Sequence, residues 1–65
     1  MKKDTYLVVY VNGDENTFYC TSVYIAYCVA TYEMNKKGRD SRIKYIHNED
    51  NGTTYSDFNL TYKVK

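Results

Sequence analysis

Apolar residues along the chain form several runs. One has the spacing of a helix, and the others are typical of β-strands. Residues 6–11, YLVVYV, form a continuous β-branched and aromatic run, which is typical of a central strand covered on both faces. Asn12 and Gly13 indicate a tight turn, after which residues 17–20 return as a second strand. The first 20 residues therefore predict a β-hairpin.

Residues 23–37 carry the clearest helical pattern. Thr21 or Ser22 can cap the helix, no Gly or Pro interrupts it, and Gly38 stands where a left-handed residue commonly ends a helix. Apolar residues three and four positions apart form one stripe, which we expect to pack on the sheet. This stripe contains Val23, Ala26, Tyr27, Ala30 and Met34.

Two further strands are expected after the helix. Residues 42–48 alternate, which groups Ile43 with Tyr45 and His47 on one side, and residues 49–52 form a turn. Period-2 alternation is cleanest in the last segment and predicts a strand with one buried face. Its apolar positions are Phe58, Leu60, Tyr62 and Val64.

The order β-β-α-β-β predicts a small two-layer α+β domain, in which an antiparallel sheet of three to four strands carries one helix on one face. At 65 residues the chain is too short for two independent cores, so residues 1–65 are expected to form a single domain. Folds of this size usually depend on disulfides, a metal or association for part of their stability.

The predicted helix has more apolar surface than a sheet can cover. A second group lies outside the buried stripe, and residues 22–32 contain no charged residue at all. We expect this second face to be a protein interface, either with a larger protein or with a second copy in a structural homodimer. The alternative is that strands curl around the helix or a loop shields it. The interface residues are Tyr24, Ile25, Cys28, Val29 and Tyr32.

Charge adds a weaker, alternative hypothesis. The net charge is +1, which is too balanced to indicate nucleic acid or an anionic membrane as a partner. One basic segment could still track phosphates while a strand tyrosine stacks on bases, as in a small RNA or single-stranded DNA binding module. The competing interpretation is a solvated helix end that runs into an edge strand. The residues concerned are Lys36, Lys37, Arg39, Arg42, Lys44 and Tyr45.

Catalytic and metal-binding patterns are not found in the sequence. Cys20 and Cys28 match no metal or redox spacing and are expected to be reduced, packed thiols, although a bridge between them is open. Nothing in the spacing pairs either thiol with His47 as a base. The glycines stand singly in turns, so no phosphate-binding loop is indicated. We therefore expect no enzyme activity, no cofactor and no metal.

The composition indicates where in the cell the protein is expected and what kind of genome encodes it. No run approaches the roughly 20 apolar residues that cross a bilayer, and the run after Lys3 lacks a cleavage-type end, so a cytoplasmic protein is expected. Tyr, Lys and Asn supply 22 of 65 residues, which indicates an AT-rich genome. Small size, many tyrosines and no catalytic pattern resemble in type the accessory proteins of phages that infect low-GC bacteria. The resulting hypothesis is a non-catalytic protein that binds, and inhibits or adapts, a host enzyme or defence protein.

Overall fold

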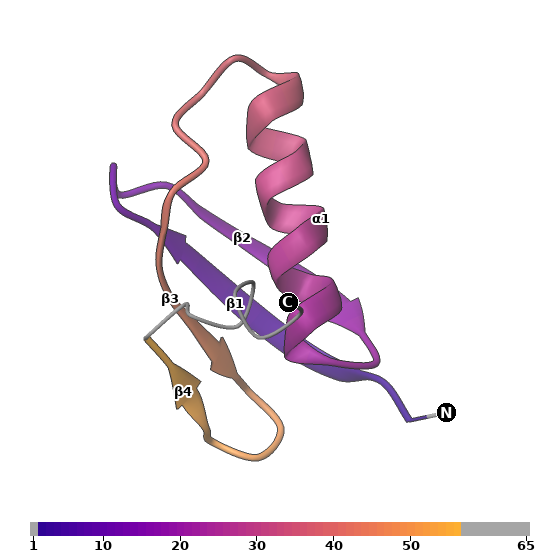
Figure 1. Ribbon diagram of the computed structural model, residues 1–65. Coiled ribbons are helices and arrows are strands. Elements are labelled where there is room, and N and C mark those ends of the chain that lie inside the picture. The colour runs from indigo at the N-terminus through magenta and orange to yellow at the C-terminus, as the bar shows by residue number, and fades with distance from the viewer. Residues whose placement is uncertain (1, 57–65) are drawn as a thin grey trace, which may run out of the picture.

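The structure is a computed structural model that describes residues 2–56 (Figure 1). Its four strands form one antiparallel sheet in the order β2-β1-β3-β4, and the helix α1 crosses one face of that sheet. The predicted α+β class and the order β-β-α-β-β are confirmed. The elements are β1 (Asp4–Tyr10), β2 (Glu15–Cys20), α1 (Val23–Lys36), β3 (Ile43–Asn48) and β4 (Thr54–Tyr55).

The first hairpin closes through a three-residue loop. The N–H of Tyr10 donates to the carbonyl of Asp14 at 2.8 Å, and the N–H of Gly13 donates to the carbonyl of Tyr10 at 3.0 Å. Gly13 has a φ of 95°, so this is a turn followed by a glycine bulge, a common hairpin connection. The side-chain oxygen of Asn12 accepts the N–H of Asp14 at 2.9 Å. These contacts set the register of β1 against β2.

Strand β1 lies between β2 and β3, and its pairing with β3 contains an irregularity. The register shifts between Val9 and Tyr10, so that Tyr45 lies opposite Val9 while Ile43 lies opposite Tyr10. Ile43 therefore packs against the core beside Tyr10, and Tyr45 projects from the other face of the sheet. The predicted grouping of Ile43 with Tyr45 and His47 is wrong, because a bulge interrupts the alternation on which it was based.

Helix α1 begins and ends with side-chain and glycine caps. Ser22 is the N-cap, and its hydroxyl accepts the N–H of Ile25 at 3.2 Å. At the other end Gly38 has a φ of 71°, and the N–H of Arg39 donates to the carbonyl of Met34 at 2.9 Å. Both predicted ends of the helix are correct to within one residue.

The core lies between α1 and the facing side of the sheet. Tyr6, Val8 and Tyr10 of β1 are buried there, and half-buried apolar side chains surround them. Every residue of the predicted helix stripe contributes: three are buried and two pack at the margin. The remaining buried members are Ala26, Ala30, Met34 and Ile46, and the marginal ones are Phe18, Cys20, Val23, Tyr27 and Ile43.

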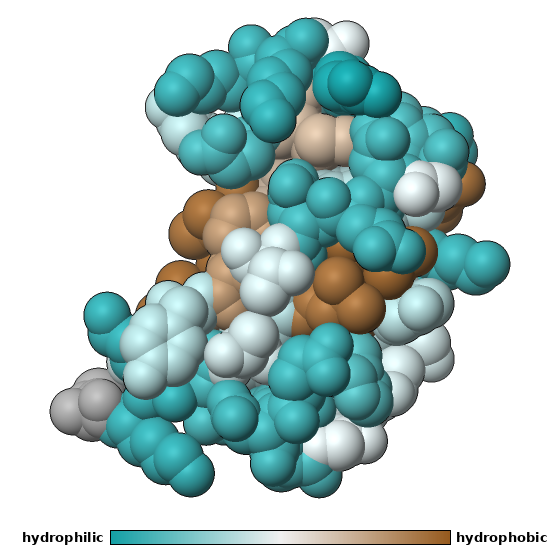
Figure 2. Space-filling model, turned by 180° about the vertical axis from the view of Figure 1, so that it is seen from behind, coloured by the Kyte–Doolittle hydropathy of each residue, from teal (hydrophilic) through white to brown (hydrophobic). Residues whose placement is uncertain are grey.

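The other face of the sheet has no covering layer within residues 2–56. Figure 2 shows this side, where hydrophobic colour runs across the middle and hydrophilic residues lie above and below it. Val9 is nevertheless only 8% exposed, because neighbouring strand residues such as Tyr45 crowd around it. The expectation that β1 is covered on both faces is therefore wrong for the described part of the chain: on this face Val9 is buried, but Thr5 and Leu7 are only half-buried.

A buried asparagine organises the second hairpin. Asn48 is 1% exposed, and its side-chain oxygen accepts the N–H groups of Asp50 and Asn51 at 2.8 and 3.1 Å. Its side-chain nitrogen donates to Asp4 at 3.0 Å. The predicted turn at residues 49–52 is confirmed, but it leads directly into the two-residue strand β4. The expected strand with Phe58, Leu60, Tyr62 and Val64 lies outside the described residues.

We expect Tyr10→Phe to lower the free energy of unfolding by about 1–2 kcal/mol, because both hydrogen bonds of the Tyr10 hydroxyl would be lost. The Tyr10 hydroxyl donates to the carbonyl of Ala30 at 3.2 Å and accepts from the side chain of Asn16 at 3.1 Å. Urea unfolding followed by circular dichroism measures the change. Tyr32→Phe is the matched control, since that side chain is 63% exposed and its hydroxyl can bond to water. Equal stabilities of the two variants would contradict the assignment.

Candidate functional site

The outer face of α1 consists of Tyr24, Ile25, Cys28, Val29 and Tyr32, the five residues that the sequence pattern predicts. All five are exposed: Ile25 by 41%, Tyr24 by 42%, Val29 by 37% and Tyr32 by 63%, with Cys28 also open to solvent. Within residues 2–56 neither the strands nor a loop shields them. The helix therefore presents two apolar surfaces, one buried on the sheet and one facing outward.

The outer face is held in place by the same contacts that secure the buried stripe. Ala26 and Ala30 are fully buried against the sheet, so Cys28 and Val29, which lie between them on the opposite side of the helix, turn toward solvent. Thr31 adds a local contact, because its hydroxyl lies 3.1 Å from the carbonyl of Tyr27 and 3.0 Å from that of Cys28. The five side chains thus lie on a capped helix with a fixed orientation, which reduces the entropy lost on binding.

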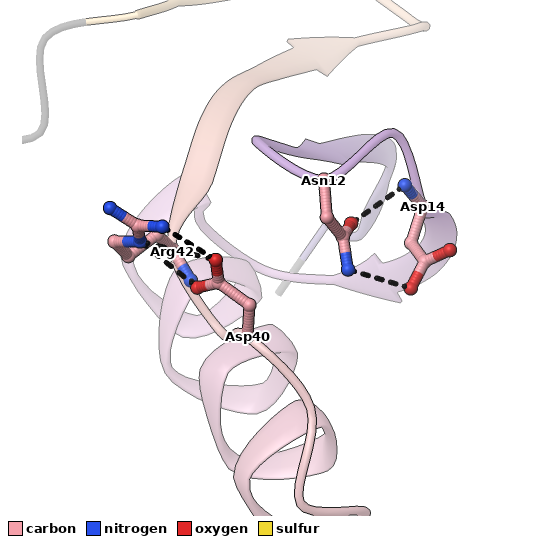
Figure 3. A network of polar contacts seen from close by, with 4 residues as sticks. All are labelled: Asn12, Asp14, Asp40 and Arg42. Atoms are coloured by element: carbon pink, nitrogen blue, oxygen red, sulfur yellow. Dashed lines mark hydrogen bonds and ion pairs between the residues drawn. The ribbon is translucent and has the colours of Figure 1, made fainter.

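The basic segment is less available for phosphates than its sequence indicates. Arg39 pairs with Asp14 at 2.9 Å, which links the end of α1 to the first hairpin. Arg42 forms a two-pronged contact with Asp40, with its Nη2 2.7 Å from one carboxylate oxygen and its Nε 3.0 Å from the other (Figure 3). Two of the five predicted cations therefore already have carboxylate partners. Lys36, Lys37 and Lys44 are exposed.

The predicted stacking residue does not share a surface with all of these cations. Tyr45 projects from the sheet face opposite α1 and is half-buried, whereas Lys36 and Lys37 lie at the end of the helix. A nucleic-acid strand that followed Lys36 and Lys37 would thus have to pass around the edge of the sheet before a base could stack on Tyr45. The structure brings the five residues of the outer face together but divides the nucleic-acid candidates between two sides.

The Cys20 thiol and the His47 ring have structural partners, and the Cys28 thiol is open to solvent. Both cysteines are free: Cys28 is exposed, and Cys20 is half-buried with its Sγ 3.8 Å from the carbonyl of Ser22. Burial raises the pKa of the Cys20 thiol, which disfavours the nucleophilic thiolate. Nδ1 of His47 shares a hydrogen bond of 2.7 Å with the Thr54 hydroxyl across β3 and β4. Among residues 2–56, no three His, Cys, Asp or Glu side chains are grouped to hold a metal ion.

Comparison with protein families, with curated proteins and with solved structures finds no match for this chain. The described part of the chain also contains no helix that is long and apolar enough to span a membrane. The most distinctive surface of the described residues is the outer face of α1.

The Asp40–Arg42 pair should lower the pKa of Asp40 and make stability depend on pH in the acid range. Hydrogen bonds from the Arg42 side chain and backbone lower the pKa of Asp40 from 3.8 to about 2. Because the folded pKa lies below the unfolded one, the pair favours the folded state above about pH 4, and this contribution disappears as the pH falls toward 2. NMR titration of the Asp40 carboxyl measures the shift. Arg42→Gln should return the pKa toward its ordinary value, and an unchanged low pKa would contradict the pairing.

Proposed function

We propose that the protein is a non-catalytic interaction module that binds a larger protein through the outer face of α1. The observation that carries the proposal is the group of five adjacent, exposed and uncharged side chains on one well-capped helix. Exposed apolar residues that are scattered singly are normal on a protein surface, but a contiguous group commonly marks a contact site. In a domain this small, such a group takes up much of one side.

The spacing of the group indicates how it binds. Tyr24, Cys28 and Tyr32 lie four residues apart, with Ile25 and Val29 beside them, which is the pattern of a helix that lies in an apolar groove. Exposed lysines follow directly at the end of the helix. The complementary partner is therefore a protein with an apolar groove that has an acidic rim at one end, where Lys36 and Lys37 would lie.

Tyrosine suits the centre of such an interface. Tyr24 and Tyr32 offer large, fairly rigid contact areas with a polar end, and tyrosine is enriched among the residues that dominate binding energy. A standard interface involves about 20–30 residues a side, so the five residues form its centre and neighbouring polar residues its rim. We expect Ile25 and Tyr32 to carry most of the affinity.

The wider setting extends this proposal. We further propose that the partner is a host enzyme or defence protein, which this phage-encoded module inhibits or adapts in the cytoplasm. The small size and the composition rich in Tyr, Lys and Asn support this proposal. The alternative of RNA or single-stranded DNA binding rests on the three exposed lysines. The carboxylate partners of Arg39 and Arg42 disfavour it, because phosphates would compete with contacts already made.

Replacing Ile25 and Tyr32 with Asp should reduce partner capture on the order of thirtyfold, because charge would enter an apolar contact. The measurement is affinity capture from a nuclease-treated lysate of the source cells or their host, with quantitative mass spectrometry. Val11→Asp is the matched control, since Val11 is 47% exposed but lies in the first hairpin loop, away from α1. Circular dichroism confirms that each variant is folded.

Cys28 provides an independent test of the contact surface. A photo-crosslinker attached to this exposed thiol, in a Cys20→Ser background, should form a covalent product with the captured protein at an apolar groove. Equal capture by the wild type and the helix variants would refute the outer face as the binding site. Capture that is seen from an untreated lysate but is lost from the nuclease-treated one would instead favour the nucleic-acid alternative.

A further inference from the structure

The outer edge of β2 is an unprotected strand edge. In the sheet order β2-β1-β3-β4, β2 is an edge strand six residues long, and within residues 2–56 only β1 pairs with it. Edge strands are usually blunted by lysine, proline, a bulge or shortness. β2 contains neither Lys nor Pro, and its register with β1 runs without a shift from Asp4 opposite Cys20 to Val9 opposite Glu15. At the opposite edge, the part of β4 within the described residues is two residues long.

The hydrogen-bonding pattern identifies which groups of β2 face outward. Tyr10 donates to Asp14, and pairs in an antiparallel ladder alternate between bonded and non-bonded. The register then directs the backbone groups of Asn16, Phe18 and Cys20 toward β1. Those of the intervening residues point to the open edge. These residues are Glu15, Thr17 and Tyr19, all of them exposed.

We propose that β2 pairs with β2 of a second copy, in antiparallel register with Thr17 opposite Thr17 of the partner. In that register every outward group within the strand finds a partner, because Glu15 then faces Tyr19 of the other copy. The result is about six backbone hydrogen bonds and one continuous sheet of eight strands. This contact uses a different surface from the outer face of α1 and does not depend on the proposed function.

Charge complementarity selects a second copy as the occupant. The Lys3 ammonium lies 5.8 Å from the centre of the Tyr19 ring, so each protomer has a cation above the residue that Glu15 of the other copy would face. Glu15, Thr17 and Tyr19 project from the same face of the sheet, the one opposite α1. Two symmetric Glu15 to Lys3 contacts would thus flank the twofold axis. Association would also supply stability that a core of this size seldom provides alone.

Sedimentation equilibrium of the purified full chain should show a monomer–dimer equilibrium. Thr17→Lys should raise the dissociation constant at least about tenfold, because two like charges would meet at the axis. Thr53→Lys is the matched control: the residue is also exposed but lies in the second hairpin loop, and dimerisation of this variant should be unaffected. In the dimer, hydrogen exchange at the Thr17 amide should slow as concentration rises.

A cysteine at the axis keeps the test independent of any effect of Thr17→Lys on folding. In a Cys20→Ser, Cys28→Ser background, Thr17→Cys should oxidise to a disulfide-linked dimer, because paired Cα atoms about 5.5 Å apart are within disulfide range. Thr53→Cys should not. A monomer at every concentration, with no protection at Thr17, would overturn the proposal. A dimer that Ile25→Asp abolishes and Thr17→Lys leaves intact would overturn it as well, since the contact would then be the helix.

Discussion

The hydrogen bond from the Tyr10 hydroxyl to the carbonyl of Ala30 is the contact on which the rest of the structure depends. It joins the central strand to the middle of α1, and the bond from Asn16 to the same hydroxyl adds β2 to the junction. Burial raises the pKa of Tyr10, so the hydroxyl keeps the proton that it donates. A single side chain therefore connects β1 and β2 to the middle of α1.

That junction also explains why α1 has an outward apolar face. A tyrosine can reach the helix backbone only where the helix presents small residues, and Ala26 and Ala30 occupy those positions. Apart from Met34, which is buried in the core, the large apolar side chains of the helix then lie at its margin or on the far side. Burying the side chains on the far side would require a third layer outside α1, which residues 2–56 do not contain. The outer face is thus a consequence of how closely the two layers approach.

Sequence reasoning recovered the fold class, the helix with its caps and the five exposed helix residues, because helical periodicity and glycine positions are local properties. It failed where pairing between strands decides the outcome. The bulge near Tyr10 moved Ile43 to the core side, and β4 formed at Thr54, immediately after the turn that Asn48 organises. Likewise, an edge such as β2 is visible only once the strand order is known. The proposed interface remains a prediction from an exposed surface.

Separate faces on one helix have an evolutionary consequence. At Ala26 and Ala30 a larger side chain would push the layers apart, so substitutions there affect folding. At Ile25, Val29 and Tyr32 a change alters what the surface can contact but removes little from the core. Selection for a new binding specificity could therefore act on one side of α1 with little loss of stability. Under the proposed function, a lineage that faces a changing target could revise the outer face of α1 while retaining the same scaffold.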